Sequence, residues 1–228
     1  VIGIISCMFI MIYNHYFEYE YVWQHSSLEL PTHYMISCFW EGQEGSFLLW
    51  TFWNIVLGVL LMKKSNYWEP TVMTIVSVIQ VFLASMVLGI YVFGVKLGSS
   101  PFVLIRNLEE NIGLPWTEMH NYLQAVPQFL DGRGLNPLLQ NYWMVIHPPI
   151  LFLGFSLTMI PFAFAISGLW KKNYSEWIEE ALPWTYAGIM VLGTGILMGG
   201  AWAYEALSFG GFWAWDPVEN SSLVPWII

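Results

Sequence analysis

Charged residues are scarce in this sequence. They make up 10% of its 228 residues, against about 25% in soluble globular domains. Only seven residues are lysine or arginine, whereas 57% are hydrophobic and 18% are aromatic. So few charges exclude a soluble enzyme or a disordered chain, and a net charge of −9 excludes nucleic-acid binding, which needs a basic surface. The composition predicts an integral membrane protein.

Cysteine is also rare. Cys7 and Cys38 are too few and too far apart for a disulfide framework, a redox pair or a cysteine-rich metal site, so we expect each to be a small apolar residue. No secretory signal peptide is visible. The chain begins at Val1 and ends at Ile228 inside apolar runs, which leads us to expect a fragment with parts missing at both ends.

Long hydrophobic runs dominate what is present. Five charge-free runs approach the roughly 20 residues that a helix needs to cross a bilayer. They are Val1–Phe17, Ser46–Met62, Thr71–Val95, Asn141–Trp170 and Ala181–Tyr204. Alternation with a period of two, typical of a barrel, is absent. We therefore predict an all-α, polytopic membrane helical bundle of about five spans in residues 1–203, a Trp-rich outer loop in 204–220 and the start of a further span in 221–228.

Basic residues set the predicted orientation. One short connection contains Lys63 and Lys64, and another contains Lys171 and Lys172. By the positive-inside rule both connections are expected to be cytoplasmic. The opposite, outer face then receives the segments 18–45, 96–140 and 205–220. Because these are long and unusual connections, we look for function there.

The first outer segment contains two histidines and two glutamates beside several aromatic residues: His25, His33, Glu41 and Glu44. Glu44 stands at the mouth of a span, where a carboxylate is either solvated or tied into the bundle; we favour the solvated alternative. In the second segment we expect His120 to be a surface residue. Arg106 and Arg133 are the only arginines, and each is either a surface residue or the partner of a carboxylate ligand.

His147 lies six residues into an apolar run and is followed by Pro148 and Pro149. An ionisable residue in a span is a site hypothesis by default, although a structural histidine bonded to a carbonyl is an equal alternative. Because the prolines lack N–H groups and disfavour a helical residue before them, we predict that the helix starts or bends at Pro148. His147 would then lie at a break near the outer face.

The third outer segment is the richest in aromatic residues. Seven occur between positions 202 and 226: Trp202, Tyr204, Phe209, Phe212, Trp213, Trp215 and Trp226. An interfacial aromatic belt is the simplest explanation. The pair Gly210-Gly211, however, lets the backbone turn tightly and approach a ligand, and clustered indoles form an apolar surface for a large flat molecule. Asp216, Pro217 and Glu219 further match a capping box for a helix that begins at Pro217.

Four stretches together resemble the CcmF/NrfE family of cytochrome c haem lyase subunits. They are His25-Ser-Ser with Leu30-Pro, Gly42-Gln-Glu-Gly-Ser46, Asp131-Gly-Arg-Gly134 through His147-Pro-Pro149, and Gly210-Gly-Phe-Trp-Ala-Trp-Asp-Pro-Val-Glu-Asn220. The last resembles the "WWD" signature of haem-handling proteins. The resemblance covers nearly the whole chain.

The resemblance implies a multi-span protein of a bacterial, or alternatively organellar, inner membrane that faces the periplasm. It implies cytochrome c maturation: haem arrives from the haem chaperone CcmE, a CcmH-type subunit presents apocytochrome c, and thioether bonds form. An alternative is a haem export or delivery protein of the CcmC/CcsA type that loads a chaperone without forming the covalent bond.

The resemblance also implies site residues. The expected haem-binding residues are His147, Trp202, Tyr204, Trp213, Trp215, Asp216, Glu219 and Asn220. It assigns His147 as one axial ligand of a structural haem b, with haem also the transferred substrate, and places three further histidine ligands beyond Ile228. We therefore expect no catalytic acid or base here, a role in orienting haem, and a fragment that is inactive alone.

Overall fold

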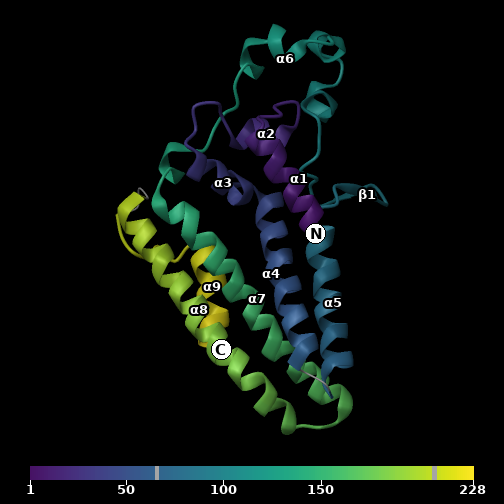
Figure 1. Cartoon of the computed structure of the whole chain (residues 1–228), viewed down its shortest axis with the longest axis vertical. Coiled ribbons are helices and arrows are strands. Elements are labelled where there is room, and N and C mark those ends of the chain that lie inside the picture. The colour runs from purple at the N-terminus through teal and green to yellow at the C-terminus, as the bar shows by residue number, and fades with distance from the viewer. Residues whose placement is uncertain (65–66, 207–209) are drawn as a thin grey trace. The chain divides into compact units, whose positions relative to one another are not determined.

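A computed structural model describes residues 1–64, 67–206 and 210–228. The chain divides into two compact units. Unit 1 comprises residues 1–48 and 85–140, and unit 2 comprises 49–84 and 141–228. Three helices are long and apolar enough to cross a membrane (Figure 1): α4 (Gln43–Lys64), α7 (Tyr142–Lys171) and α8 (Glu176–Ala206). They match three of the five predicted spans.

The other two predicted spans are shorter than their apolar runs. Helix α1 covers Ile2–Tyr13 and helix α5 covers Glu69–Ser85. The prediction of one span over Thr71–Val95 is wrong in its second half, because the chain leaves the helix at Ser85 and forms an antiparallel hairpin. Its strands are β1 (Ile90–Val92) and β2 (Val95–Leu97). Positive φ angles at Gly89, Phe93 and Gly94 bend the backbone in ways a helix does not allow.

Unit 1 consists of short elements. After α1 come α2 (Glu20–His25), α3 (Thr32–Glu41) and the first turns of α4. The hairpin is followed by η1 (Ile105–Asn107), η2 (Glu109–Asn111), η3 (Pro115–Glu118), α6 (Tyr122–Ala125), η4 (Pro127–Phe129) and η5 (Pro137–Leu139). A small aromatic core joins η1, η3, α6 and η4 to α2, with Ile105, Tyr122 and Phe129 buried against Trp23 and Trp116. The backbone N–H of Arg133 and that of Gly134 donate to the carbonyls of Trp23 and Ser26, which fastens the second outer segment to α2.

Unit 2 is built on the antiparallel pair α7 and α8, with α4 and α5 packed on the same core. Glycines allow the pair to approach closely. A Cβ on Gly154 would lie 2.7 Å from Cα of Leu192, and one on Gly195 would lie 3.1 Å from Cα of Leu151. Small residues that bring backbones together are typical of packing between membrane helices. They fix which residue of α7 faces which residue of α8.

Helix α9 (Pro217–Ile227) confirms the predicted capping box. The Asp216 carboxylate accepts hydrogen bonds from the N–H groups of Val218 and Glu219, at 2.7 and 2.8 Å. The Glu219 side chain returns to accept from the Asp216 N–H at 3.2 Å. Reciprocal bonds of this kind satisfy N–H groups that have no partner inside the helix. The start of α9 is therefore fixed by local sequence.

Of the two predicted alternatives, a helix that starts at Pro148 or one that bends there, the start is wrong. Helix α7 begins at Tyr142, where the Asn141 side chain caps it by accepting from the Trp143 N–H at 3.0 Å. Pro148 and Pro149 lie inside this helix, in its second turn and just beyond. The Asn141 cap determines the helix start because it satisfies a free N–H group nearly two turns before Pro148. His147 therefore lies within helix α7, on a defined face, and not ahead of the first residue of the helix.

Candidate functional site

One cavity of unit 2 gathers most of the residues that the sequence singles out. It has a volume of about 150 Å³ and lies where α7, α8, the loop after α8 and α9 meet. Five of the eight expected site residues line it: His147, Trp202, Trp213, Asp216 and Glu219. Residues 147 and 219 are 72 positions apart in the sequence, so the fold brings together what the motifs list separately.

His147 enters this cavity from α7. Its imidazole lies edge-on to the indole of Trp202, with ring centroids 5.7 Å apart and planes at 65°. The Gly195 carbonyl interacts with the imidazole, but Nδ1 is buried without a hydrogen bond among the described residues. Buried polar atoms are rarely left without a partner. An unbonded imidazole nitrogen in an aromatic cavity is the chemistry of a ligand to a metal or a porphyrin iron.

Glycines of α8 make the space for this ring. Gly199 faces His147, and a Cβ there would lie 3.0 Å from Cε1 of the imidazole. The contacts His147–Gly199, Leu151–Gly195 and Gly154–Leu192 follow each other in steps of four and three residues along both helices. The ring position is thus set by the register of the helix pair. Sequence reasoning missed Gly199, although the spacing of Gly195 and Gly199 along one face of a membrane helix is a signal for it.

The aromatic residues fall into two groups. The indole nitrogens of Trp202 and Trp213 are buried without hydrogen-bond partners among the described residues. Outside the cavity, Tyr204 and Phe212 stack in parallel with centroids 4.3 Å apart, and Trp215 meets Trp213 edge-on at 5.8 Å. These outer rings are open, with Tyr204 60%, Phe212 59% and Trp215 69% exposed. Phe209, the remaining aromatic residue of the loop, lies outside the described residues.

The polar residues of the Trp-rich segment hold its backbone. Glu219 accepts from the Ala214 N–H at 2.8 Å in addition to its capping bond, and the Asn220 amide donates to the Trp215 carbonyl at 3.0 Å. Trp215 needs this support because its φ of 59° is unusual for a large side chain. Asp216, Glu219 and Asn220 thus fix the loop in place, and the first two also reach the cavity wall.

A second contact between α7 and α8 lies one turn from His147. The Trp143 indole N–H donates to the Glu205 carboxylate at 2.6 Å. Trp143 and His147 are four residues apart on α7, and Trp202 and Glu205 are three apart on α8, so each pair shares a helix face. This hydrogen bond therefore holds the outer ends of the two helices in the register that places His147 against Trp202.

The motifs of the first outer segment form a separate, closely packed cluster in unit 1. The Tyr21 hydroxyl donates to the Phe39 carbonyl at 2.8 Å and accepts from the Gly42 N–H at 3.2 Å. A Cβ on Gly45 would lie only 1.5 Å from the Phe39 carbonyl oxygen. Burial, followed by the charge of Glu44, raises the pKa of the Tyr21 phenol well above its ordinary value. This phenol is therefore a fixed structural donor at neutral pH.

His25 and Glu41 form a pair within this cluster. The His25 Nδ1 lies 3.1 Å from Oε2 of Glu41, with 18% and 11% of the two side chains exposed. The contact has the distance of an ion pair without the angles of a hydrogen bond, since that oxygen has no hydrogen-bond partner among the described residues. His33 and His120 are exposed, as expected for His120.

Arg133 packs on an aromatic ring. Its guanidinium lies 4.4 Å from the centre of the Trp23 ring, and a Cβ on the adjacent Gly132 would lie 1.9 Å from the Ser26 carbonyl oxygen. Arg106 is exposed on η1.

Cys38 is fully buried, and burial raises the pKa of its thiol to about 12. It therefore stays protonated and unreactive, in agreement with its interpretation as a small apolar residue.

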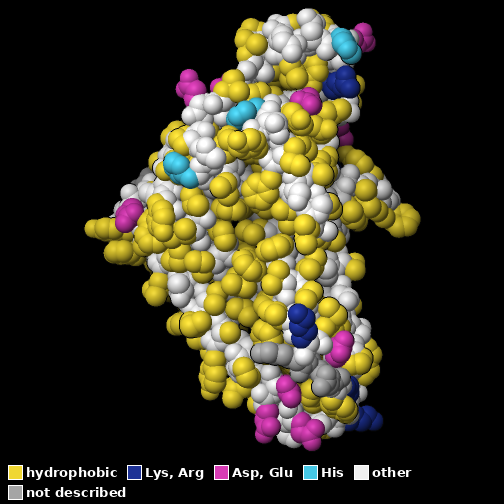
Figure 2. Space-filling view, viewed as in Figure 1, with side chains coloured by type: hydrophobic (Ala, Val, Ile, Leu, Met, Phe, Trp, Pro, Cys, Tyr) yellow, Lys and Arg dark blue, Asp and Glu magenta, His cyan; other side chains and the backbone are white. Residues whose placement is uncertain are grey.

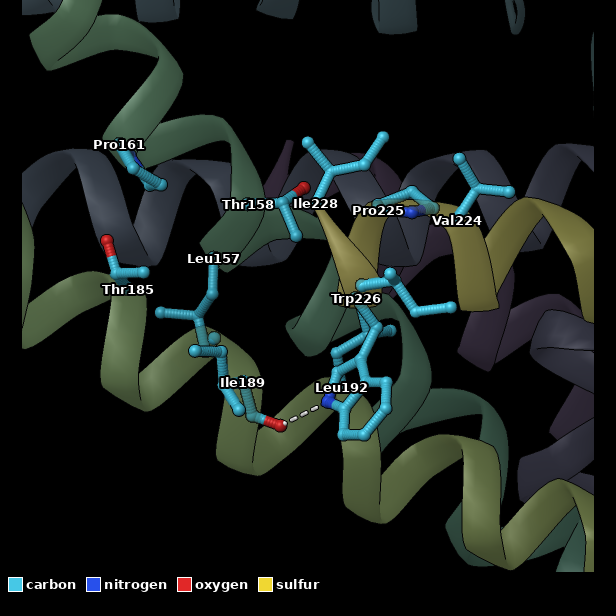
Figure 3. Close-up of a pocket in the computed structure, with 12 residues that line it drawn as sticks. Leu157, Thr158, Pro161, Thr185, Ile189, Leu192, Val224, Pro225, Trp226 and Ile228 are labelled. Atoms are coloured by element: carbon cyan, nitrogen blue, oxygen red, sulfur yellow. Dashed lines mark hydrogen bonds between the residues drawn. The ribbon is translucent and has the colours of Figure 1, made fainter.

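A larger cavity of unit 2 is lined by fewer side chains that could bind or react with a ligand. It measures about 520 Å³ and lies between α7, α8 and the end of α9 (Figure 3). The hydroxyls of Thr158 and Thr185 donate to carbonyls of their own helices, and the Trp226 indole donates to the Ile189 carbonyl at 2.9 Å. Its remaining lining is apolar or backbone. No histidine or carboxylate side chain of the described residues lines it, so the smaller cavity at His147 is the stronger candidate for a functional site.

Comparison with known proteins gives consistent results. A family model described as "Cytochrome C assembly protein" matches residues 40–228. The cytochrome c-type biogenesis protein CcmF of Haemophilus influenzae is 34% identical over 92% of this chain and 29% of its own length. CcmF of Escherichia coli is 35% identical over 93% of this chain and 29% of its own. NrfE of Haemophilus influenzae is 31% identical over 93% and 30%.

A solved structure agrees with the sequence relatives. "Cytochrome c Heme Lyase CcmF" aligns with a TM-score of 0.73 and 28% identity, over 98% of this chain and 31% of that chain. The chain thus spans slightly less than a third of the length of the proteins it matches.

Proposed function

The chain belongs to the cytochrome c assembly protein family, and on that premise we propose that it forms the part of a cytochrome c haem lyase subunit that binds haem beside His147 and orients it for covalent attachment to apocytochrome c. The observation that carries the proposal is the shared cavity: one imidazole nitrogen and two indole nitrogens with no hydrogen-bond partner among the described residues lie together beside the Trp-rich loop. In this role the haem chaperone CcmE and a CcmH-type subunit with its apocytochrome are the partners, at the periplasmic face of the inner membrane.

The cavity and the exposed aromatic rings next to it together offer a surface for one face of haem. At about 150 Å³ the cavity is smaller than the 300 Å³ or more of typical small-molecule pockets, so it would take in only the part of the macrocycle next to His147. The exposed rings of Trp215, Phe212 and Tyr204 offer the larger flat surface beside it. Haem bound there supplies the iron that His147 ligates and the vinyl groups to which cysteine thiols add.

This chain's own residues do the positioning. His147 provides an imidazole nitrogen as a ligand atom, and the packing register of α7 against α8 fixes its position. Trp202 and Trp213 give the cavity apolar walls that exclude water. Asp216, Glu219 and Asn220 fix the loop backbone. Asp216 and Glu219, the carboxylates that line the cavity, are engaged with backbone N–H groups of the loop and of α9, which favours catalysis by orientation.

The geometry favours one haem assignment for His147 over another. The resemblance implies a structural haem b, separate from the haem that the loop handles. Because His147 and Trp213 line the same cavity, we instead favour His147 as a ligand of the haem that lies against the loop. The two assignments differ in what His147→Ala removes: a tightly held resting haem in the first case, and newly delivered haem in the second.

The test is haem content in the full-length protein purified from membranes. We expect His147→Ala to lose most of the haem that wild-type protein acquires from its chaperone, by the Soret band and by a pyridine haemochrome assay. His120→Ala, which changes an exposed histidine, is the matched control and is expected to retain it. Unchanged acquisition and an unchanged spectrum in His147→Ala would refute the proposal.

A further inference from the structure

The hairpin of residues 90–97 is the most exposed apolar element among the described residues. All six strand residues are exposed, as are both turn residues. Phe93 at the tip is fully exposed, and its neighbour Val95 is 62% exposed. Figure 2 shows hydrophobic side chains covering the hairpin that Figure 1 labels β1. An isolated two-stranded hairpin is marginally stable in water, so a surface that covers these side chains is required.

The base of the hairpin is fixed to the end of helix α5. The Ser99 N–H donates to the Met86 carbonyl at 3.0 Å, and a Cβ on Gly98 would lie 2.4 Å from the carbonyl oxygens of Ser85 and Met86. The depth of the hairpin in a membrane therefore follows from that of Ser85.

Helix α5 places Ser85 close to the outer boundary of the bilayer. Its 17 residues rise about 25 Å at 1.5 Å per residue, less than the roughly 30 Å of a hydrocarbon core. It begins six residues after Lys63, in the connection that the charge pattern assigns to the cytoplasmic face. The apolar residues after Ser85 then begin near the outer edge of the hydrocarbon, so the hairpin lies at the boundary between acyl chains and head groups.

The polar groups of the hairpin fit the interfacial layer. Lys96 is its only charged residue, and a lysine at this level reaches lipid phosphates while its stem lies along apolar surface. The Tyr91 hydroxyl donates to the Glu109 carboxylate, which leaves an apolar ring with a polar end, as is usual for interfacial tyrosines. The outer N–H and C=O groups of two lone strands need water or head groups, so the hairpin does not enter the core.

We propose that the hairpin of residues 90–97 inserts into the outer leaflet, with Phe93 and Val95 in contact with phospholipid at the boundary between head groups and acyl chains. The occupant of its exposed faces is lipid, not another protein segment. The inference does not depend on haem binding.

The test is the depth of a spin label at the tip. The full-length protein carrying Cys7→Ser and Phe93→Cys is labelled and reconstituted in vesicles of phosphatidylethanolamine and phosphatidylglycerol; Cys38 is buried and stays in place. Power saturation compares collisions with oxygen, which concentrates in the bilayer, with collisions with a water-soluble nickel chelate. We expect oxygen collisions to exceed nickel collisions several-fold, and Val95→Cys, labelled in the same way, to agree.

The matched control is Gln124→Cys, an exposed position on α6 that is expected to collide mainly with nickel. Two outcomes overturn the proposal. Nickel collisions that match those of Gln124→Cys would place the hairpin in water. Low collisions with both reagents, at both hairpin positions, would show that protein covers it.

Discussion

The outer segments of unit 1 and the cavity at His147 in unit 2 both carry motifs of the same family, but they use their polar groups differently. In unit 1 the Tyr21 hydroxyl and the Asp131 carboxylate are bonded to main-chain groups at 2.8 Å. At the cavity, the imidazole Nδ1 of His147 and the indoles of Trp202 and Trp213 have no hydrogen bonds among the described residues. Tyr21 and Asp131 are thus bonded internally and act as scaffold, whereas an imidazole and two indoles without partners that gather at one cavity are the features of a site.

Glycines show the same difference. A Cβ on Gly45 or Gly132 would lie 1.5 or 1.9 Å from a main-chain carbonyl oxygen, closer than any Cβ tolerates. A Cβ on Gly199 would lie 3.0 Å from the His147 ring, where a small shift of the ring relieves the contact. Substitutions in the first region should therefore change folding, and substitutions in the second should change binding.

The largest expected effect is in the scaffold. Gly45→Ala would place a Cβ 1.5 Å from the Phe39 carbonyl oxygen, and overpacking against rigid backbone costs about 3 kcal/mol or more. We expect a clear fall in the melting temperature of the detergent-solubilised protein. Gly3→Ala, whose Cβ meets nothing within 4 Å, is the control and should be neutral or slightly stabilising. Equal stability of both variants would contradict the packing described for unit 1.

A smaller, site-specific effect is expected at Gly199. A Cβ there pushes on Cε1 of His147, so Gly199→Ala should weaken haem binding about fivefold, equivalent to roughly 1 kcal/mol, with little loss of thermal stability. The control is Gly188→Ala on the same helix, where the nearest atom of α7 is 3.6 Å away. Haem titration followed at the Soret band measures the difference. If both variants titrate like wild type, Gly199 does not set the ring position.

Loss of the helix cap should lower the stability of α9 by about 1 kcal/mol. Asp216→Ala removes both bonds to the first turn of α9, whereas Asp216→Asn keeps a side-chain oxygen that caps nearly as well. We expect Asp216→Ala to loosen the loop, seen as faster amide hydrogen exchange over 213–220, and Asp216→Asn to stay close to wild type. If Asn behaves like Ala, the charge of Asp216 matters and capping is not its main role.

The smallest effect is expected from the hydrogen bond at the outer ends of α7 and α8. Trp143→Phe removes the indole N–H that donates to Glu205. At this exposed position the loss should lower the free energy of unfolding by about 1 kcal/mol or less. Its signature is a broadened or shifted Soret band with nearly unchanged haem content, because His147 remains but its register is less well fixed. A spectrum identical to wild type would confine this bond to a stabilising role.

Local signals were sufficient for parts of the fold. Asp216, Pro217 and Glu219 specify the start of α9, and the charge-free runs locate α4, α7 and α8. The run Thr71–Val95 misleads because hydrophobicity cannot distinguish a helix from an apolar hairpin, and the glycines that end the helix are only weak signals. Pro148 is also misleading as a start signal: the Asn141 cap starts α7 nearly two turns earlier, and the helix continues through both prolines.

Much of the site required three-dimensional information. The sequence pointed to His147, Trp202 and Trp213 as binding residues, but it contained no sign that they line one cavity or that Gly199 faces the imidazole. These contacts depend on the register of α7 against α8, which is a property of tertiary packing. The same limit applies to Arg133, whose stacking on Trp23 joins residues 110 positions apart.

The most direct test of the central claim is chemical rescue at His147. We expect His147→Gly in the full-length protein to bind little delivered haem, and added imidazole, which can enter the space left by the ring, to restore both haem binding and the wild-type Soret position. Imidazole should have no such effect on His120→Gly. Wild-type haem binding by His147→Gly without imidazole would contradict the assignment of the cavity as a haem site.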